Sequence, residues 1–270
     1  MIIKVVIEDS SEHGLATEHG LCLWIEACGR RFFCDLGQTG LFADNAARLG
    51  IRPEEAEFAV ISHGHYDHGG GIPVFLLLNA SAPVYVHENA FSDHYSTRNG
   101  QTKYIGLPHN LQAENRIKTT DGTIQIADGI ALFTGGCGND FFSPANRRIL
   151  KRDDSQLVCD DFCHEQSLLI REGGNNVLIA SCAHSGILNI IRKAEQVSGM
   201  PVTHVVAGMH MSGVTDSAFI EGFAEVLKAK NCRYYTFHCT GREFYDRLKP
   251  IMGQQISYLS AGDIINIGEA

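Results

Sequence analysis

Residues 62–71 constrain the fold of this chain more than any other segment. Their sequence is Ser-His-Gly-His-Tyr-Asp-His-Gly-Gly-Gly, and it directly follows the apolar run Phe-Ala-Val-Ile at 58–61. An apolar run of this length, closed by serine and followed by glycines, predicts a buried strand that ends in a loop. The loop therefore carries three imidazoles and one carboxylate at the edge of a sheet, where such groups can converge on a cation.

The side chains of this loop have the chemistry of metal ligands. Neutral imidazole and carboxylate suit zinc, and also manganese or iron. His63 and His65 are two positions apart, so both rings can lie on one side of an extended segment, whereas Asp67 and His68 follow on the turn and can face a second metal. The alternative is a polar loop with incidental histidines. Three histidines and an aspartate within six positions argue against it.

Further histidines, with one aspartate and one cysteine, occur where other predicted strands end or begin. For each of them the alternative is a strand-end turn or a buried histidine with ordinary hydrogen bonds. Strand ends that meet at one sheet edge would gather these residues although they are far apart in the chain. They are Asp35 at the end of 31–35, Cys182 and His184 after 176–181, His210 after 204–207, His238 after 233–237, and His164 with Glu165 before 167–171.

The remaining pattern alternates strands with helices. Hairpins are expected at 21–26 with 31–35 and at 124–127 with 130–134, and helices at 41–49, 72–78, 187–197 and 216–230. Strands are also expected at 1–7, 83–87 and within 256–267. No linker or repeat interrupts the chain, so residues 1–270 are predicted to form a single domain with loosely patterned active-site inserts around 89–118 and 135–163. This order favours an α/β fold in which two mixed sheets lie between helices.

Composition limits the partners. The formal net charge of −9 provides no basic footprint for nucleic acid. No apolar run of about 18 residues occurs that could span a membrane. Glu8 and Asp9 come too early for a signal peptide, so a cytoplasmic location is expected. The nine cysteines include no Cys-x-x-Cys pair, which argues against a zinc ribbon or a simple iron–sulfur motif and favours mostly small, buried thiols in a reducing compartment.

The pattern His-x-His-x-Asp-His at 63–68 resembles the signature of the metallo-β-lactamase superfamily. Further short motifs resemble one branch of this superfamily, which contains the dihydropterin ribofuranosylaminobenzene phosphate synthases and many metal-dependent hydrolases. These motifs lie at 18–21, 35–40, 164–168, 182–187, 208–211 and 238–241. The resemblance runs from residue 1 to about 267 and does not fix the substrate.

The resemblance implies an αββα sandwich of two mixed β-sheets with one or two divalent metal ions at the sheet edge. Zinc is the expected metal, with manganese or iron as alternatives. Asp67 and His210 are the implied catalytic residues, His210 as a proton donor to the leaving group, and Asp35 orients a ligand. His164 is a rival of His184 for the third histidine of the first metal, and Cys182 occupies the place of the usual bridging aspartate. The implied metal ligands are His63, His65, Asp67, His68, His184 and His238.

The expected function is that of a metal-dependent hydrolase or a related transferase acting on a small anionic, phosphorylated molecule, with a dihydropterin phosphate synthase-like reaction as one form of it. A non-catalytic metal-binding sensor and an iron redox protein on the same fold are the alternatives. Neither nucleic acid nor a membrane is an expected partner, and association into a homo-oligomer is left open.

Overall fold

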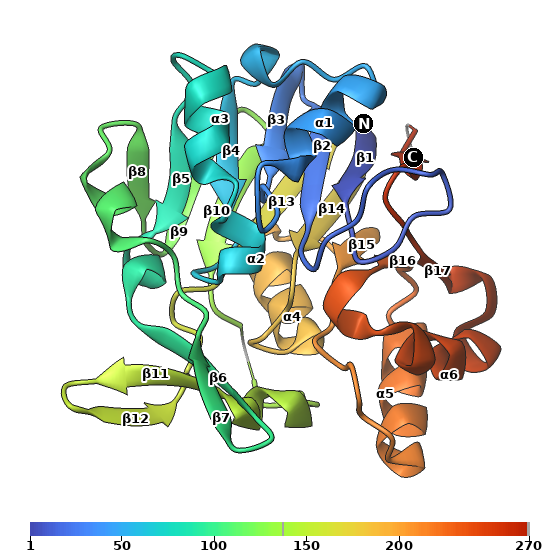
Figure 1. The fold of residues 1–270 in the computed structure, drawn as a ribbon. Coiled ribbons are helices and arrows are strands. Elements are labelled where there is room, and N and C mark those ends of the chain that lie inside the picture. The colour runs from blue at the N-terminus through green and yellow to red at the C-terminus, as the bar shows by residue number, and fades with distance from the viewer. Residues whose placement is uncertain (137, 269–270) are drawn as a thin grey trace. The chain divides into compact units, whose positions relative to one another are not determined.

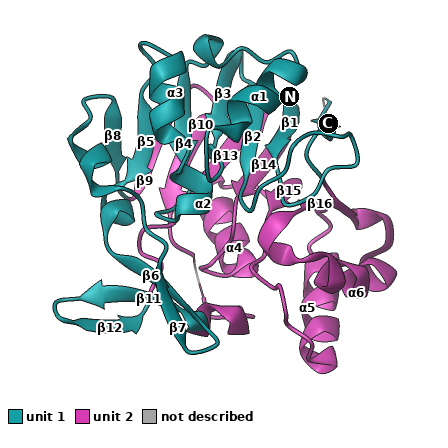
Figure 2. Ribbon diagram, in the orientation of Figure 1, with its two compact units in different colours: residues 1–121, 148–160, 260–268 teal, residues 122–147, 161–259, 269–270 magenta. Residues whose placement is uncertain are grey.

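The computed structural model describes residues 1–136 and 138–268. Cys137, one of the nine cysteines counted above, lies outside them. The chain groups into two compact units, which Figure 2 colours separately. Unit 1 comprises Met1–Asp121, Arg148–Asp160 and Ser260–Gly268, and unit 2 comprises Gly122–Arg147 and Asp161–Leu259. The single domain expected from the sequence stays a prediction.

The main sheet of unit 1 has seven strands in the order β18-β1-β2-β3-β4-β5-β8 (Figure 1). β1, β2, β3 and β18 pair antiparallel, whereas β3, β4, β5 and β8 pair parallel, so the sheet is mixed, as the sequence predicts. The predicted hairpin turns at Cys28 and Gly29, which both have positive φ. The strands are β1 (Ile2–Ile7), β2 (Cys22–Ala27), β3 (Arg30–Cys34), β4 (Phe58–Ile61), β5 (Val84–His87), β8 (Ile117–Thr120) and β18 (Ile264–Asn266).

Helices α1 (Leu41–Arg48), α2 (Tyr66–Gly69) and α3 (Ile72–Leu78) belong to the same unit. The predicted helices 41–49 and 72–78 are thereby confirmed to within one residue. Phe33 of β3 meets Phe42 of α1 and Phe75 of α3 edge-on, with ring centroids 5.6 and 5.9 Å apart. This aromatic contact joins both helices to the sheet beside β4, the strand that carries the histidine loop.

A second, four-stranded sheet of unit 1 has the order β12-β11-β6-β7 (Figure 1). Its strands are β6 (His94–Arg98), β7 (Gln101–Tyr104), β11 (Ile149–Asp153) and β12 (Gln156–Cys159). Loosely patterned inserts are expected here from the sequence, whereas the structure shows two hairpins. β7 is exposed along its whole length, so its sequence lacks the alternation that reveals a half-buried strand. Short 3₁₀ helices of unit 1 lie at Pro53–Glu55, Glu88–Phe91 and His109–Ala113, and a further one at Pro144–Arg148 leads into β11.

Unit 2 is built on a seven-stranded mixed sheet in the order β17-β16-β15-β14-β13-β10-β9. β14, β15, β16 and β17 run parallel, and the remaining pairs are antiparallel. The strands are β9 (Thr123–Ala127), β10 (Ile130–Thr134), β13 (Gln166–Glu172), β14 (Asn175–Ala180), β15 (His204–Ala207), β16 (Arg233–Thr236) and β17 (Ile256–Tyr258).

Three helices pack on this sheet: α4 (Ile187–Ser198), α5 (Ser217–Ala229) and α6 (Arg242–Met252). α4 and α5 match the predicted helices, and the Asp216 side chain caps α5 by accepting a hydrogen bond from the Phe219 amide. α6 was not predicted. Its last turn contains Pro250, a residue that argues against a helix when only the sequence is read. Short 3₁₀ helices lie at His238–Thr240 and Gly253–Gln255.

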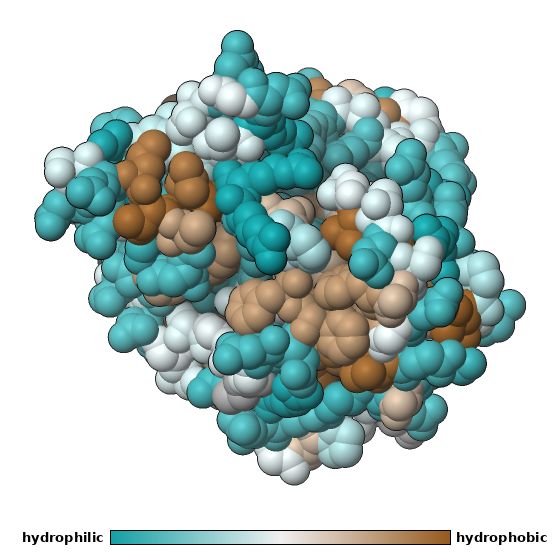
Figure 3. Space-filling model, turned by 90° about the horizontal axis from the view of Figure 1, so that it is seen from below, coloured by the Kyte–Doolittle hydropathy of each residue, from teal (hydrophilic) through white to brown (hydrophobic). Residues whose placement is uncertain are grey.

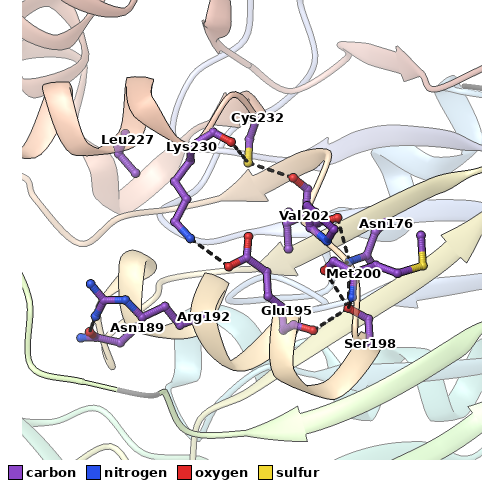
Figure 4. A network of polar contacts seen from close by, with 12 residues as sticks. Asn176, Asn189, Arg192, Glu195, Ser198, Met200, Val202, Leu227, Lys230 and Cys232 are labelled. Carbon is purple, nitrogen blue, oxygen red and sulfur yellow. Dashed lines mark hydrogen bonds and ion pairs between the residues drawn. The ribbon is translucent and has the colours of Figure 1, made fainter.

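A polar network fixes the end of α4 (Figure 4). The buried Asn176 amide donates to Ser198 Oγ at 3.0 Å and to the Met200 carbonyl at 3.1 Å. Lys230 forms an ion pair of 2.8 Å with Glu195. Because Asn176 belongs to β14, these contacts tie the C-terminal end of the helix to the strand that leads into His184.

The surface carries both hydrophilic and hydrophobic side chains, as the face in Figure 3 shows. The large hydrophobic residues that are exposed belong to several elements, among them Leu77 of α3, Tyr104 of β7 and Leu157 of β12. Scattered residues of this kind are normal for a folded surface. Within residues 1–136 and 138–268, no helix is long and apolar enough to cross a membrane.

Candidate metal centre

In unit 1 the predicted metal loop lies at the carboxyl edge of the parallel strands. β3, β4 and β5 are adjacent and parallel, so the residues that follow them share one edge. Asp35 follows β3, and Ser62 and His63 follow β4. The register pairs Cys34 with Val60, which brings Asp35 beside Ser62.

Asp35 organises this edge through its fully buried carboxylate. Its Oδ1 accepts the Ser62 amide at 2.7 Å, and its Oδ2 accepts the Ser62 hydroxyl at 2.8 Å and lies 2.7 Å from His68 Nδ1. A carboxylate only accepts, so His68 donates from Nδ1. The Ser62 hydroxyl, having donated to Asp35, accepts from His63 Nδ1 at 2.8 Å. Both rings thus present Nε2 as the lone-pair nitrogen, which is the form that binds a metal.

The three histidine rings of the loop are neighbours. The ring centroid of His63 lies 4.5 Å from that of His65 and 4.2 Å from that of His68. Asp67 Oδ2 lies 3.8 Å from His68 Nε2 and 3.4 Å from Nε2 of His19. Unit 1 therefore brings His63, His65, Asp67 and His68 together, with Asp35 behind them.

Glycine is required within this loop for a steric reason. A Cβ atom on Gly64 would lie 2.3 Å from the carbonyl oxygen of Ala90, closer than real Cβ atoms come. The backbone between His63 and His65 is therefore pressed against the 3₁₀ helix that follows β5, and this packing fixes the position of both rings.

Two residues of unit 1 that the sequence analysis did not select lie beside His65. His94 begins β6 and Asp160 follows β12, and ligand atoms of His65, His94 and Asp160 all lie within 4.8 Å of one another. The signal that could have identified them was weak, because a single His or Asp in a polar segment has no local pattern.

In unit 2 the predicted histidines also follow parallel strands. Ala183 and His184 come after β14, His210 after β15 and His238 after β16, and these strands are adjacent and parallel. Ala183, His210 and His238 all have φ near +50°. Non-glycine residues rarely adopt this left-handed conformation, and they do so mainly where the surrounding structure enforces it at functional sites.

Glu165 holds the loop that carries His184. Its carboxylate accepts the amides of His184 at 2.6 Å and Ser185 at 2.8 Å. Burial raises the pKa of this carboxyl, and the two loop amides partly oppose the shift. The His184 ring stacks on Phe162 with centroids 4.5 Å apart, and its Nδ1 lies 3.4 Å from Asn146 Oδ1. Glu165 is thus engaged in positioning His184.

A thiol-containing cluster lies at the same edge of unit 2. Ligand atoms of Cys182, His210 and Cys239 are within 4.8 Å of one another, and the centroids of the His210 and His184 rings are 4.2 Å apart. Burial alone would raise the pKa of the Cys239 thiol. Hydrogen bonds with Cys182 and His210, and the nearby His238, instead bring that pKa well below its usual value. Such a thiol is available as the thiolate that binds metals.

The donor set fits a divalent metal. Unit 1 offers imidazoles held in the metal-binding tautomer together with the Asp67 carboxylate, and unit 2 offers imidazoles with thiols. Nitrogen, oxygen and sulfur donors of this kind suit zinc and iron. His164 and His184 both lie in unit 2 and are buried, and which of them is the third histidine stays a prediction, as does the role of His238.

The chain is similar to known proteins in both sequence and structure. The family model described as the metallo-beta-lactamase superfamily matches residues 17–145, which include the loop at 62–71. A crystal structure of Tm1679, a metal-dependent hydrolase of the beta-lactamase superfamily, superposes with a TM-score of 0.84 at 26% identity and covers 99% of both chains. The matched family model and the superposition support the resemblance of the chain to the metallo-β-lactamase superfamily, and the predicted α/β fold with two mixed sheets is confirmed.

The chain is also similar to two proteins of Methanocaldococcus jannaschii. One is the uncharacterized protein MJ0448, 26% identical over 98% of this chain and 100% of that protein. The other is 7,8-dihydropterin-6-methyl-4-(beta-D-ribofuranosyl)-aminobenzene-5'-phosphate synthase, 24% identical over 92% of this chain and 90% of that protein. The resemblance to the branch that contains such synthases is thereby supported.

Proposed function

We propose that the protein is a metal-dependent enzyme that hydrolyses or transfers a group of a small, phosphorylated substrate. The observation that carries the proposal is the hydrogen-bonded chain from Asp35 through Ser62 to His63, with His68 as a second branch. A buried carboxylate that sets the tautomer of two adjacent imidazoles is the arrangement expected behind metal ligands. The similarity to a metal-dependent hydrolase supports the same class.

The ligands proposed for one or two divalent ions are His63, His65, Asp67 and His68 of unit 1 and His184 and His238 of unit 2, with His164 and Cys182 of unit 2 as further candidates. Zinc is the metal that their donor atoms suit best. When bound, the cation supplies Lewis acidity, which polarises a phosphoryl oxygen and stabilises the negative charge of the reaction. The overall acidity of the chain does not oppose an anionic substrate, because divalent cations dominate the local field.

The protein's own groups then move protons. Asp67 lies beside His19 and His68, where its carboxylate can accept a proton from the attacking group. His210 is the proposed proton donor to the leaving oxygen. The Nδ1 atom of its ring has no hydrogen-bond partner among the described residues, and its backbone is held by Cys239 and Ser143. An imidazole whose ordinary pKa is about 6.5 can donate a proton at neutral pH.

A phosphorylated substrate is proposed from the similarity to the dihydropterin phosphate synthase. The same residues serve either outcome. Hydrolysis needs water as the attacking group, and a synthase-like transfer needs an amine or carbon nucleophile of a second substrate. The protons handled by Asp67 and His210 are the same in both.

Metal content and turnover of aryl phosphomonoesters and phosphodiesters test the proposal. We expect between one and two divalent metals per chain by mass spectrometry, and His65→Gln should lose metal and activity together. His87→Gln is the matched control. His87 ends the neighbouring strand β5, but no sequence pattern makes it one of the predicted ligands. A chain that takes up no metal after dialysis against zinc or manganese would refute the proposal. A metal-loaded chain that turns over no phosphoester would refute the substrate class.

A further inference from the structure

His94 and Asp160 form a buried pair whose function is not explained by the metal loop. The two side chains have exposures of 1% and 0%, and His94 Nδ1 lies 2.8 Å from Asp160 Oδ2. The ring centroid of His94 lies 5.6 Å from that of His65, with the planes at 77°. One ligand atom from each of these three residues lies within 4.8 Å of the other two. This spacing places His94 and its carboxylate partner Asp160 next to His65, a predicted ligand of the histidine loop.

The small sheet of unit 1 builds this pair. His94 is the first residue of β6 and pairs with Lys151 of β11. Cys159, the last residue of β12, pairs with Leu150 of β11, and the following Asp160 donates its amide to the Ile149 carbonyl at 3.1 Å. Two hairpins that are distant in sequence are therefore held in a register that places an imidazole and a carboxylate next to each other.

We propose that His94 is a metal ligand of unit 1 that binds through Nε2 next to His65, with Asp160 as the carboxylate that orients it. This inference rests on the proposed function, because it needs a divalent metal at the histidine loop. The hydrogen bond at Nδ1 leaves Nε2 as the lone-pair nitrogen of the His94 ring. A carboxylate on the far nitrogen of a ligating histidine also makes that ring a stronger donor.

A second His–Asp pair of the same insert shows the difference between a surface pair and this one. His109 Nε2 lies 2.9 Å from Asp93 Oδ1, but the His109 side chain is 60% exposed, and Asp93 also binds Arg152. Water solvates that pair. The contact between His94 and Asp160 is instead made away from water, so it holds the orientation of the His94 ring, as the carboxylate behind a ligating histidine does.

The test compares zinc affinities of the full chain by competition with a chromogenic chelator. The variants are His94→Gln and Asp160→Asn, with His109→Gln as the matched control and His63→Gln as the reference for the predicted site. Asp160→Asn should weaken zinc binding about 10–100-fold, the usual effect of losing a group that orients a ligand. His94→Gln should weaken it at least as much, and His109→Gln should leave it unchanged. The thermal midpoints of the metal-free proteins show whether each variant folds.

The outcomes separate this inference from the proposed function. If the unmodified chain binds no zinc, the proposed function fails. If His63→Gln loses zinc while His94→Gln and Asp160→Asn bind within twofold of the unmodified chain, only the role of His94 is refuted, and the pair serves to hold the small sheet. If His94→Gln does not fold, Asp160→Asn decides, because asparagine keeps the size of the side chain. The visible spectrum of the cobalt-loaded chain gives a second readout, since loss of a nitrogen ligand changes its d–d bands.

Discussion

Replacing Asp35 with asparagine should weaken metal binding without removing a single metal ligand. Asp35 has φ of +59°, a conformation that asparagine tolerates about as well as aspartate, so the backbone should stay in place. The amide oxygen can still accept the Ser62 backbone N–H. Its NH₂ group then faces Ser62 Oγ and His68 Nδ1, which both donate to the carboxylate in the native protein.

Two donors cannot face each other, so His68 is expected to change tautomer and place its proton on Nε2, the nitrogen that should bind the metal. Loss of a group that orients a ligand typically lowers metal affinity about 10–100-fold. That factor corresponds to about 1.4–2.8 kcal/mol of binding free energy. The stability of the metal-free protein should fall as well, because each hydrogen bond to a buried charged group contributes about 1.5–3 kcal/mol.

Zinc competition with a chelator measures the affinity, and nitrogen-15 NMR of the histidine rings reports the tautomer. Ser62→Ala is the control, since it removes the partner of His63 Nδ1 while His68 keeps Asp35. It should shift the His63 signals and leave those of His68 unchanged. Unchanged zinc affinity in Asp35→Asn, or a His68 ring that keeps its proton on Nδ1, would refute this reasoning.

Three further predictions concern other parts of the edge. His210→Ala should keep its metals and lose about 10²–10⁴-fold in rate on a substrate with a poor leaving group, but much less with an activated aryl leaving group; metal loss in the variant would make His210 a ligand instead. Burial lowers the pKa of His87, although Asp121 partly opposes the shift, so folding favours the neutral form of this imidazole. The free energy of unfolding should therefore fall as the pH drops below the unfolded pKa of about 6.5. In urea titrations His87→Gln should make this dependence on pH less steep, and an equal dependence in both proteins would contradict the role of His87. The cobalt-loaded protein should show a thiolate charge-transfer band that is weaker in Cys182→Ser. Cys232→Ser is the control, because the buried Cys232 thiol donates to the Val202 carbonyl, and it should leave the band unchanged. Equal bands in both variants would exclude Cys182 as a metal ligand.

The elements that the sequence could predict are those with a strong local pattern. The hairpin of β2 and β3 and the helices α1, α3, α4 and α5 each have an apolar period with glycine or a cap at the end, and the structure places them where that pattern ends. The small sheet and α6 lack such a pattern. β7 is exposed throughout, and Pro250 lies within α6. Their structure depends on contacts with distant segments.

The same distinction applies to the candidate site. The predicted ligands at 63–68 could be proposed from the sequence because a single short segment carries them. The connection of Asp35 to Ser62 depends on the parallel pairing of β3 with β4, which places Cys34 opposite Val60. Parallel strands are joined by long crossovers, so no turn chemistry fixes their register locally. His94 and Asp160 have no local pattern either, because 66 positions separate them and only the pairing of β6 with β11 brings them together.

Strained backbone at both sheet edges is consistent with a functional role for these loops. Asp35 in unit 1 and Ala183, His210 and His238 in unit 2 are non-glycine residues with φ between +48° and +59°. A residue in such a region costs about 1–3 kcal/mol and persists only where the surroundings determine it. The surroundings do so here: three hydrogen bonds hold the Asp35 carboxylate, and Cys239 and Ser143 hold the backbone of His210. Strand-end loops that keep this conformation while presenting imidazoles fit the proposed cation site, because glycine would relieve the strain if the side chains had no task.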